Sequence, residues 1–366
     1  MARRGSKRVD YLTFFTFLAL LLGVGLAALA SASSDLGKID FDDPFYYLKD
    51  QLIFGIGIGA LAFLVGYFTN YRLYKKFAPL ILIGSIVLLI MVFTPLGISA
   101  GGAQRWIPIG PLTIQPSELL KLTMILYLAA WLSSSKASRE KKFAEGLVPF
   151  ISIVGFISLL LLFQRSTSAA VIIGAVAVII YIAAGARWSF VGLIALFGAA
   201  LLSIFIVSTP YRLERVKTFF DPSVDTQGAS FQVNQSLTVI GSGGLFGVGY
   251  GQSNAKGSLP ERMGDSIFSI IAEEFGFVGA MLVSLLFATL VIRGFLLAKR
   301  SRDKFGRLLL VGLSSLIGIQ AFIHIGSASA LIPTTGVPLP FISYGNFSIA
   351  IFMAVVGVML NVQRNS

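Results

Sequence analysis

Long apolar runs, separated by short polar or charged segments, constrain this chain more than any other feature. Ten such runs, most of 17 to 22 residues, occur along the 366-residue sequence, and roughly 20 apolar residues suffice to cross a bilayer as a helix. A helix satisfies its own backbone groups in lipid, and the alternation typical of a membrane β-barrel is absent. The sequence therefore predicts an all-α polytopic membrane protein with helices over about 11–32, 50–69, 78–97, 117–134, 147–163, 168–185, 189–208, 266–292, 308–328 and 342–362.

Composition agrees with this class and excludes others. Only 13% of the residues are charged and 55% are hydrophobic, whereas a soluble domain carries about 25% charged residues. The chain has no cysteine, which excludes disulfides and cysteine-ligated metals. The first apolar run is long and lacks a small-x-small cleavage site, so we interpret it as a span and not as a cleaved signal peptide.

The basic residues are distributed unevenly between the two sides of the predicted bundle. An even number of spans puts both termini on one side, which carries 19 Lys and Arg residues against four acidic ones; the other side carries ten against eleven. Because basic residues concentrate in cytoplasmic loops, both termini are expected in the cytoplasm. The net charge of +12 is then a topology signal, and nucleic acid is not an expected partner.

Three loops rich in glycine, proline and polar residues consequently face outward: 98–116, 209–265 and 329–341. The cytoplasmic loops contain no P-loop, so cytoplasmic ATP is not an expected energy source. The glycine-rich run 241–251 does not follow the dinucleotide-binding pattern and instead predicts close backbone approach or positive φ angles.

The strongest candidate for chemistry lies where the 209–265 loop meets the eighth span, in Ser258-Leu-Pro-Glu-Arg-Met-Gly-Asp-Ser-Ile-Phe268. Asp265 there is either an N-cap of the following helix or a functional carboxylate. Glu261 is either an ordinary turn residue or part of the same site.

Glu273 and Glu274 follow inside the apolar run, where ionisable side chains are costly and suggest function. Adjacent helical residues point about 100° apart, and at least one of these carboxylates must find a cation or a hydrogen bond. We hypothesise Lys121, from another span, as that partner.

Basic residues in the outward segments offer anion contacts, each with a simpler alternative. Arg105 and Trp106 are either an interfacial anchor or a phosphate contact beside an apolar chain. Lys121 either pairs with Glu118 at i,i+3 or binds an anionic ligand. A further basic cluster, which contains Arg212, Arg215 and Lys217, is either a solvated helix end or part of the same site.

The remaining polar positions give weaker signals. His324 is the only histidine, and with no cysteine nearby a packing role is favoured over metal binding. The final outward loop, which ends at Ser343-Tyr-Gly345, is dense in proline and predicts a rigid wall. Together the outward residues suit a substrate with an anionic head and a lipid tail, and a carboxylate at the groove mouth could act as general base. The residues alone leave transporter and transferase equally open.

Five ordered motifs resemble the SEDS family, the bacterial FtsW, RodA and SpoVE group, over nearly the whole chain. They are Arg105-Trp-Ile-Pro-Ile-Gly with Ile114-Gln-Pro-Ser-Glu-Leu-Leu-Lys121; Phe220-Asp-Pro with Gln232 and Gln235-Ser236; Leu259-Pro-Glu with Asp265-Ser-Ile-Phe268; Glu273-Glu-Phe-Gly276; and Ile332-Pro with Gly336-Val-Pro-Leu-Pro-Phe-Ile-Ser-Tyr-Gly345.

The resemblance implies a single transmembrane domain over residues 1–366 in the bacterial cytoplasmic membrane, with 209–265 as a large extracytoplasmic loop. It implies a peptidoglycan glycosyltransferase that polymerises lipid II on the outer face. It also implies a class B penicillin-binding protein as transpeptidase partner, within the divisome or elongasome, and a divalent cation, Mg²⁺ or Mn²⁺, as a possible cofactor.

The resemblance also assigns residues. Asp265 falls on the family's essential aspartate and would activate the acceptor sugar's 4-hydroxyl, while Arg105 and Lys121 would hold the donor diphosphate. We expect further substrate contacts at Glu118, Glu261, Arg212, Arg215, Gln232 and Ser343. Structural or supporting roles are expected at Trp106, Glu273, Glu274 and His324.

Several positions depart from the family pattern. The usual Gln-Pro-Asp-x-Gly-Thr is Gln164-Arg-Ser-Thr-Ser168 here, Asn346 replaces a glycine, His324 stands where asparagine is usual, and Met-Gly precedes Asp265 in place of His-Thr. A division role of the FtsW type is favoured over a RodA-like elongation role. A lipid II flippase and a non-catalytic scaffold for the transpeptidase are the alternatives of a different class.

Overall fold

The computed structural model describes residues 2–100, 103–110, 112–134, 139–221, 229–253, 256–257 and 259–365. Pro222 and Ser258 of the motifs above lie outside these residues, as do parts of the loops 98–116 and 209–265. The helices are α1 (Ala2–Phe41), α2 (Tyr46–Asp50), η1 (Gln51–Gly57), α3 (Ile58–Phe68), α4 (Tyr71–Met91), α5 (Pro116–Leu132), η2 (Arg139–Lys141), η3 (Phe143–Leu147), α6 (Val148–Phe163), α7 (Thr167–Ala184), α8 (Trp188–Val207), α9 (Pro210–Phe220), α10 (Ala229–Ser242), α11 (Ile267–Arg300), α12 (Lys304–Ala328) and α13 (Asn346–Asn365).

All ten predicted spans are helical. Within the described residues, nine helical segments are long and apolar enough to cross a membrane. The remaining predicted span is α5, whose 17 residues rise about 25 Å at the α-helical 1.5 Å per residue. The all-α polytopic class is confirmed.

Several predicted boundaries differ from the structure, and the first and third spans show why. α1 continues to Phe41, nine residues beyond the apolar run, because polarity marks where lipid contact stops and not where a helix stops. The third span was predicted at 78–97, but α4 begins at Tyr71, where the Asn70 side chain caps the helix by accepting from the Arg72 N–H at 3.0 Å. It ends at Met91, ahead of the turn at Thr94 and Pro95.

The last two long helices, α12 and α13, form the centre of the bundle, and α8 lies at its edge. In an apolar 18-residue stretch of each helix, 72% of the α12 residues and 83% of the α13 residues lie inside the protein, but only 11% of those of α8. Among these nine described segments α8 is therefore the most lipid-exposed. Glycines let α3 and α13 pack closely: a Cβ at Gly357 would lie 2.3 Å from the Phe63 carbonyl oxygen. Small residues serve this purpose at helix contacts in membranes.

The outward loop 98–116 contains a small antiparallel sheet in the order β1 (Ile98–Ala100), β2 (Ala103–Ile109) and β3 (Leu112–Ile114). Ile107 pairs with Ile114 across β2 and β3, and Gly110, with a φ of 60°, lies in the turn between these strands. The prediction of a folded, non-helical loop is confirmed in the part of this loop that the structure describes.

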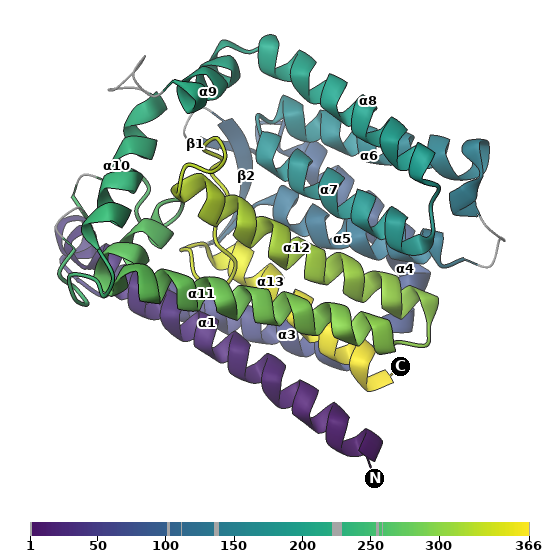
Figure 1. The fold of residues 1–366 in the computed structure, drawn as a ribbon, viewed down its shortest axis with the longest axis horizontal. Coiled ribbons are helices and arrows are strands. Elements are labelled where there is room, and N and C mark those ends of the chain that lie inside the picture. Colours follow the sequence, from purple (N-terminus) through teal and green to yellow (C-terminus); the bar gives the residue numbers. More distant parts are fainter. Residues whose placement is uncertain are drawn as a thin grey trace.

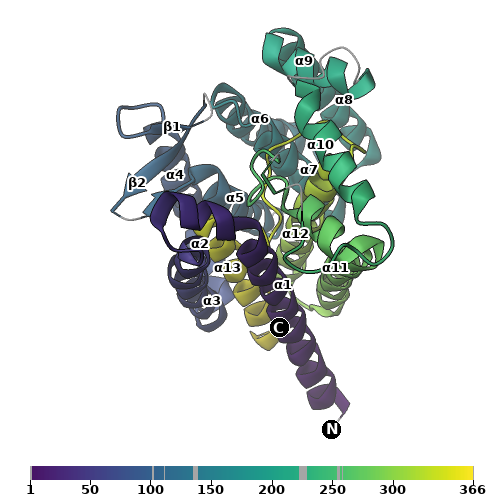
Figure 2. The ribbon, with the colours of Figure 1, turned by 90° about the vertical axis from the view of Figure 1, so that its left-hand side faces the viewer.

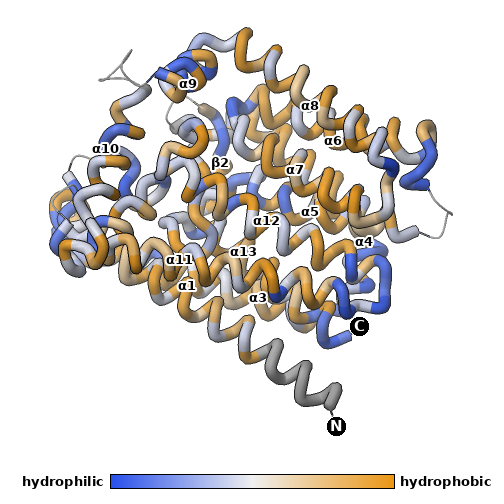
Figure 3. The backbone as a smooth tube through the Cα atoms, viewed as in Figure 1, coloured by the Kyte–Doolittle hydropathy of each residue, from blue (hydrophilic) through white to orange (hydrophobic). Residues whose placement is uncertain are grey.

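The outer elements gather at one end of the bundle. Both termini lie at the opposite end from the sheet, α9 and α10 (Figure 1). Figure 2 shows the outer end with the sheet on one side and α9 and α10 on the other. Hydrophobic segments occupy the middle of the bundle, and hydrophilic segments gather toward its two ends (Figure 3). The described part of the 209–265 loop is largely helical, because it contains α9 and α10.

α11 is broken near its outer end at Gly276, whose φ is 66° and ψ is −167°. A break frees backbone groups that have no water partner at membrane depth. The loop 243–249 satisfies them: its N–H groups donate to the carbonyls of Glu273 and Glu274 at 2.9 and 3.1 Å, and its carbonyls accept from the N–H groups of residues 277 and 278. The segment 267–275 is therefore a separate short helix, with Asp265 just ahead of its start.

Candidate active site

Asp265 lies in the tight turn that leads into α11. The N–H groups of Gly264 and Ser266 donate to the Glu261 carbonyl at 3.0 and 3.2 Å, and Glu261 has a positive φ of 47°. The N-cap residue of α11 is Ser266, and no side chain caps this helix. The capping alternative for Asp265 is therefore wrong, because the turn places the carboxylate one residue too early.

The Asp265 carboxylate lines a pocket built from segments far apart in the sequence. α10 contributes Gln232, α12 contributes His324, and the final outward loop closes the pocket against Asp265. A Cβ added at Gly336, where φ is 64°, would lie 3.3 Å from the Asp265 Oδ2. The complete lining is Gln232, Val233, Ser236, Asp265, His324, Ser327, Ala328, Thr334, Thr335, Gly336 and Val337.

The surroundings raise the pKa of Asp265 to about 6. Burial is the main cause, since it disfavours the charged form, and the neighbouring Glu261 carboxylate adds to it; Arg215 and Arg105 act in the opposite direction. A carboxyl group with a pKa near the working pH can both accept a proton and release it. This is the property that a general base requires.

Three arginines that the sequence placed among the anion contacts lie on two segments, β2 and α9. Arg105 of β2 donates to the carbonyls of Gln164 and Arg165, in the connection between α6 and α7. Arg215 of α9 donates to the Thr334 carbonyl at 2.9 Å, and so fixes the loop that lines the pocket. The electrostatic effect of Arg105 and Arg215 on Asp265 shows that both predicted anion contacts lie in its neighbourhood.

The third, Arg212, contacts the tops of the neighbouring spans. It donates to the Leu162 carbonyl at 2.8 Å and lies 5.7 Å from the ring centroid of Phe205. Burial lowers its pKa. Arg212 thus connects α9 to α6 and α8. Trp106, which follows Arg105 in β2, is half-buried.

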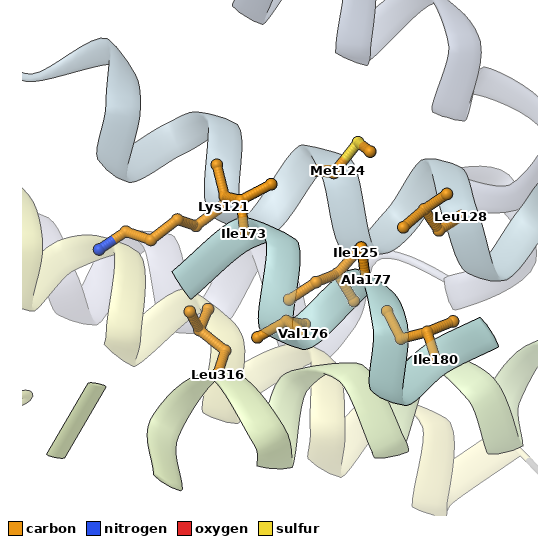
Figure 4. Close-up of a pocket in the computed structure, with 9 residues that line it drawn as sticks. All are labelled: Lys121, Met124, Ile125, Leu128, Ile173, Val176, Ala177, Ile180 and Leu316. Carbon is orange, nitrogen blue, oxygen red and sulfur yellow. The ribbon is translucent and has the colours of Figure 1, made fainter. Parts of the chain in front are cut away.

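Lys121 and Glu118 form a buried ion pair inside the bundle. Lys121 Nζ lies 2.7 Å from Glu118 Oε1, with side chains only 2% and 4% exposed, and it also donates to Gln320 Oε1 at 2.5 Å. The carbon chain of Lys121 borders a small apolar pocket between α5, α7 and α12, and its ammonium points away from the other lining side chains (Figure 4). The i,i+3 alternative is thus the observed one, and Lys121 is absent from the lining of the Asp265 pocket.

The hypothesised pairing of Lys121 with Glu273 or Glu274 is wrong. Glu274 pairs with Lys256 at 3.2 Å and accepts a hydrogen bond from Ser31 of α1, while Glu273 accepts one from the Ser253 hydroxyl. The physical reason is the break in α11, which turns its first segment toward α1 and the glycine-rich loop and away from α5. The weaker prediction, that at least one of the two carboxylates finds a cation or a hydrogen bond, is confirmed.

Two residues near Asp265 hold its turn in place. The Ser343 hydroxyl donates to the Gly264 carbonyl and accepts from the Leu339 N–H, both at 2.8 Å, and its expected substrate contact stays a prediction. Arg262 makes a bidentate pair with Asp35 of α1, at 2.8 and 2.9 Å. Its charge is therefore engaged by the protein.

Sequence reasoning missed Gln320, which connects the two polar regions. Its side-chain oxygen accepts from Lys121, and its nitrogen donates to the Pro338 carbonyl at 3.0 Å. Lys121 is thereby linked to the loop that closes the Asp265 pocket. The sequence did carry a signal for Gln320. Gln320 and His324 are polar residues spaced i,i+4, so they lie on one face of an otherwise apolar helix.

Comparisons with known proteins agree along the full chain. The family described as "Cell cycle protein" (FtsW/RodA/SpoVE) matches residues 11–366. Stage V sporulation protein E of Bacillus subtilis is 40% identical, over 95% of both chains. A probable peptidoglycan glycosyltransferase FtsW of Geobacter metallireducens is 36% identical, over 97% of this chain and 95% of that one.

Solved structures give the same result. A structure titled "Structural coordination of polymerization and crosslinking by a peptidoglycan synthase complex" matches with a TM-score of 0.79 and 28% identity, over 96% of this chain and 97% of that chain. The rod shape determining protein RodA of Thermus thermophilus matches with a TM-score of 0.68 and 29% identity, over 96% of both chains. With its sequence and its fold in agreement, the chain belongs to the FtsW/RodA/SpoVE family.

Proposed function

We propose that this protein is a peptidoglycan glycosyltransferase that polymerises lipid II, with Asp265 as the general base. The observation that carries the proposal is the Asp265 carboxyl group, whose pKa is raised to about 6 in a pocket at the outer end of the bundle. Arginines from two other segments act on the same carboxylate. A base beside anion-binding groups suits a sugar acceptor and a diphosphate leaving group.

The reaction follows from this arrangement. The acceptor hydroxyl oxygen forms a bond to the anomeric carbon of the donor sugar, and the hydroxyl proton passes to Asp265. The bond between the anomeric carbon and the lipid diphosphate breaks, and its electron pair leaves with the diphosphate. Arg105 and Arg215, which come from β2 and α9, stabilise the charge that develops on the leaving group.

Lys121 supports the site from a distance in this scheme. The ion pair with Glu118 and the bond to Gln320 hold its ammonium inside the bundle. Gln320 in turn binds the loop at Pro338. We therefore assign Lys121 and Glu118 to positioning the pocket wall, in place of direct contact with the diphosphate.

A divalent cation, Mg²⁺ or Mn²⁺, would be held mostly by the donor diphosphate. Among the described residues no group of three or more histidine, cysteine or acidic side chains is arranged to hold a metal. Asp265 and Glu261 are the carboxylates that could complete such a site, because Asp265 lines the pocket and the charge of Glu261 acts on Asp265. Mg²⁺ commonly combines one or two carboxylates with substrate phosphates.

The cellular setting of the proposal rests on charge and on relatives. The positive-inside bias puts both termini in the cytoplasm and the Asp265 pocket outside the cytoplasmic membrane. A class B penicillin-binding protein is the proposed partner, since one similar solved structure is titled as a complex that coordinates polymerisation and crosslinking. A division-type role is favoured because similar relatives carry the FtsW name.

The test is polymerisation of fluorescent lipid II by the purified full-length protein with its transpeptidase partner. We expect Asp265→Ala and Asp265→Asn each to lose roughly 10²–10⁴-fold in rate, the usual contribution of a general base. Asp43→Asn serves as the matched control, because Asp43 is an outer carboxylate paired with Lys49 and absent from the pocket lining.

The other outcomes separate the alternatives. Wild-type polymer from Asp265→Asn would reject Asp265 as base. Transfer of lipid II across vesicle membranes without glycan formation would indicate a flippase. A stable transpeptidase complex with unchanged glycan output from the Asp265 variants would indicate a scaffold.

A further inference from the structure

His324 is buried in α12 with its two ring nitrogens in different states. The residue is 1% exposed, and its Nδ1 lies 2.7 Å from the Val337 carbonyl oxygen. Because a carbonyl oxygen can only accept, Nδ1 carries the hydrogen and, in the neutral ring, Nε2 is left as an acceptor. Nε2 has no hydrogen-bond partner among the described residues.

The ring lines the same pocket as Asp265. Gln232 and Ser236 of α10 face it from one side, and the loop 334–337 closes the other. The hydroxyl oxygen of Thr335, in that loop, is a second buried polar atom without a hydrogen-bond partner in the part of the chain that the structure describes. Buried polar atoms in proteins are almost always hydrogen-bonded, so two unsatisfied atoms around one pocket indicate a polar ligand.

The chemistry of the lining identifies the class of ligand. The lining is polar, with amide and hydroxyl groups from Gln232, Ser236 and Thr335 beside Asp265. No described group of three metal-ligating side chains includes His324. A bare imidazole nitrogen requires a donor, and a sugar hydroxyl supplies one.

We propose that His324 Nε2 accepts a hydrogen bond from a hydroxyl of the saccharide bound beside Asp265, and so orients the sugar for attack. This inference rests on the proposed glycosyltransferase function. It assigns His324 a contact with substrate, in place of the helix-packing role that the sequence favoured. The neighbouring bond to Val337 fixes the tautomer that this contact needs.

The single histidine of the chain permits a direct test by ¹⁵N NMR. Full-length protein labelled only at histidine and carrying Asp265→Asn is expected to bind lipid II and to turn it over only slowly. We expect one protonated nitrogen and one bare nitrogen without ligand. Lipid II should move the bare Nε2 resonance upfield and leave Nδ1 in place, whereas undecaprenyl diphosphate, which lacks the saccharide, should not.

Two results of this experiment overturn the proposal. One is an Nε2 resonance that saturating lipid II leaves unmoved. The other is an equal shift with undecaprenyl diphosphate, because the contact would then not be with the sugar. Failure of the proposed function is distinguishable, since wild-type protein would then form no polymer at all.

A matched pair of variants provides the kinetic test. Asparagine, like neutral histidine, offers one donor and one acceptor, whereas leucine has a similar size and offers neither. We expect His324→Asn to stay within about threefold of wild type in kcat/KM, and His324→Leu to lose about tenfold or more, as when a site loses a hydrogen bond to a substrate hydroxyl. Folded His324→Leu with wild-type kcat/KM would overturn the proposal; if this variant is unfolded, the NMR result decides.

Discussion

At the scale of single residues, the outer pocket depends on opposing influences on one carboxylate. Burial and Glu261 raise the pKa of Asp265, and Arg215 and Arg105 lower it. The result, about 6, lies close enough to neutrality for proton transfer in both directions. Each neighbouring charge is therefore expected to adjust the pH range in which the site works.

The pH dependence of polymerisation follows from the ionised form being the base. We expect kcat/KM to be full above about pH 7 and to fall as pH decreases through about 6, because Asp265 becomes protonated. Glu261→Gln removes a like charge and should move this acid limb to lower pH, by roughly half to one unit. Pre-steady-state polymerisation across a pH series measures both curves.

Glu214→Gln is the control for this series, since Glu214 is an exposed outer residue of α9 that is not among the charges acting on Asp265. An acid limb that stays in place or moves to higher pH in Glu261→Gln would contradict the electrostatic account.

The buried pair of Lys121 and Glu118 makes a prediction about stability. Lys121→Met leaves the Glu118 carboxylate buried without its cation, which should cost roughly 3–5 kcal/mol. Adding Glu118→Gln removes the stranded charge and keeps an acceptor for Ser348, so the double variant should unfold at a higher temperature than Lys121→Met. Thermal unfolding of the detergent-solubilised proteins measures this, and a double variant less stable than Lys121→Met would refute the pair's role.

At the scale of elements, the break in α11 and the loop 243–249 form one unit. Close backbone contact is possible only because glycines occupy both sides: a Cβ at Gly247 would lie 2.1 Å from the Glu274 carbonyl oxygen, and one at Gly276 would lie 2.4 Å from the Gly247 nitrogen. The predicted close approach of the glycine-rich run is thus confirmed. The ion pair between Lys256 and Glu274 also holds this unit together.

Gly276→Ala should therefore destabilise this unit. Gly276 combines a φ of 66° with crowding by the backbone of Leu245 and Gly247, so neither the loop nor the helix can give way easily. We expect a loss of several degrees in the unfolding temperature and a parallel loss of polymerisation, because the displaced short helix follows directly after Asp265.

Gly241→Ala is the matched control. Gly241 lies inside α10, and nothing is within 4 Å of a Cβ added there, so alanine should be neutral or stabilise by up to about 1 kcal/mol. Equal effects of the two substitutions on the unfolding temperature would argue against the packing account.

At the scale of the whole molecule, the bundle separates two polar ends. The sheet, α9 and α10 lie at one end, and the termini lie at the other (Figure 1). The central helices α12 and α13 carry the loop that closes the pocket, so the buried core sets the position of the outer wall. The orientation of this bundle in the membrane is the global prediction.

Cysteine labelling tests the orientation without interference, because the chain has no cysteine. Phe220→Cys at the last residue of α9, where the side chain is 81% exposed, should react with a membrane-impermeant maleimide in right-side-out vesicles. Arg302→Cys, an exposed position between α11 and α12, should react only after permeabilisation. The reverse pattern would place the Asp265 pocket in the cytoplasm and end the lipid II proposal.

The sequence by itself determined the helical class, the expected spans and the positions in the chain of the three loops rich in glycine and proline. These depend on local composition: apolar length predicts a span, and glycine and proline predict a loop. The family motifs are contiguous in the chain, so the sequence also sufficed to point to the region of Asp265 as the candidate site.

Only the tertiary structure decided which charges meet. Lys121 pairs with Glu118 and Gln320, and Glu274 pairs with Lys256, although the sequence suggested that Lys121 meets one of the two glutamates. The break at Gly276 turns the first segment of α11 toward α1, and a rotation of this kind leaves no trace in hydropathy. The partners of ionisable groups in a membrane depend on which helix faces touch, and that is a property of packing across hundreds of residues.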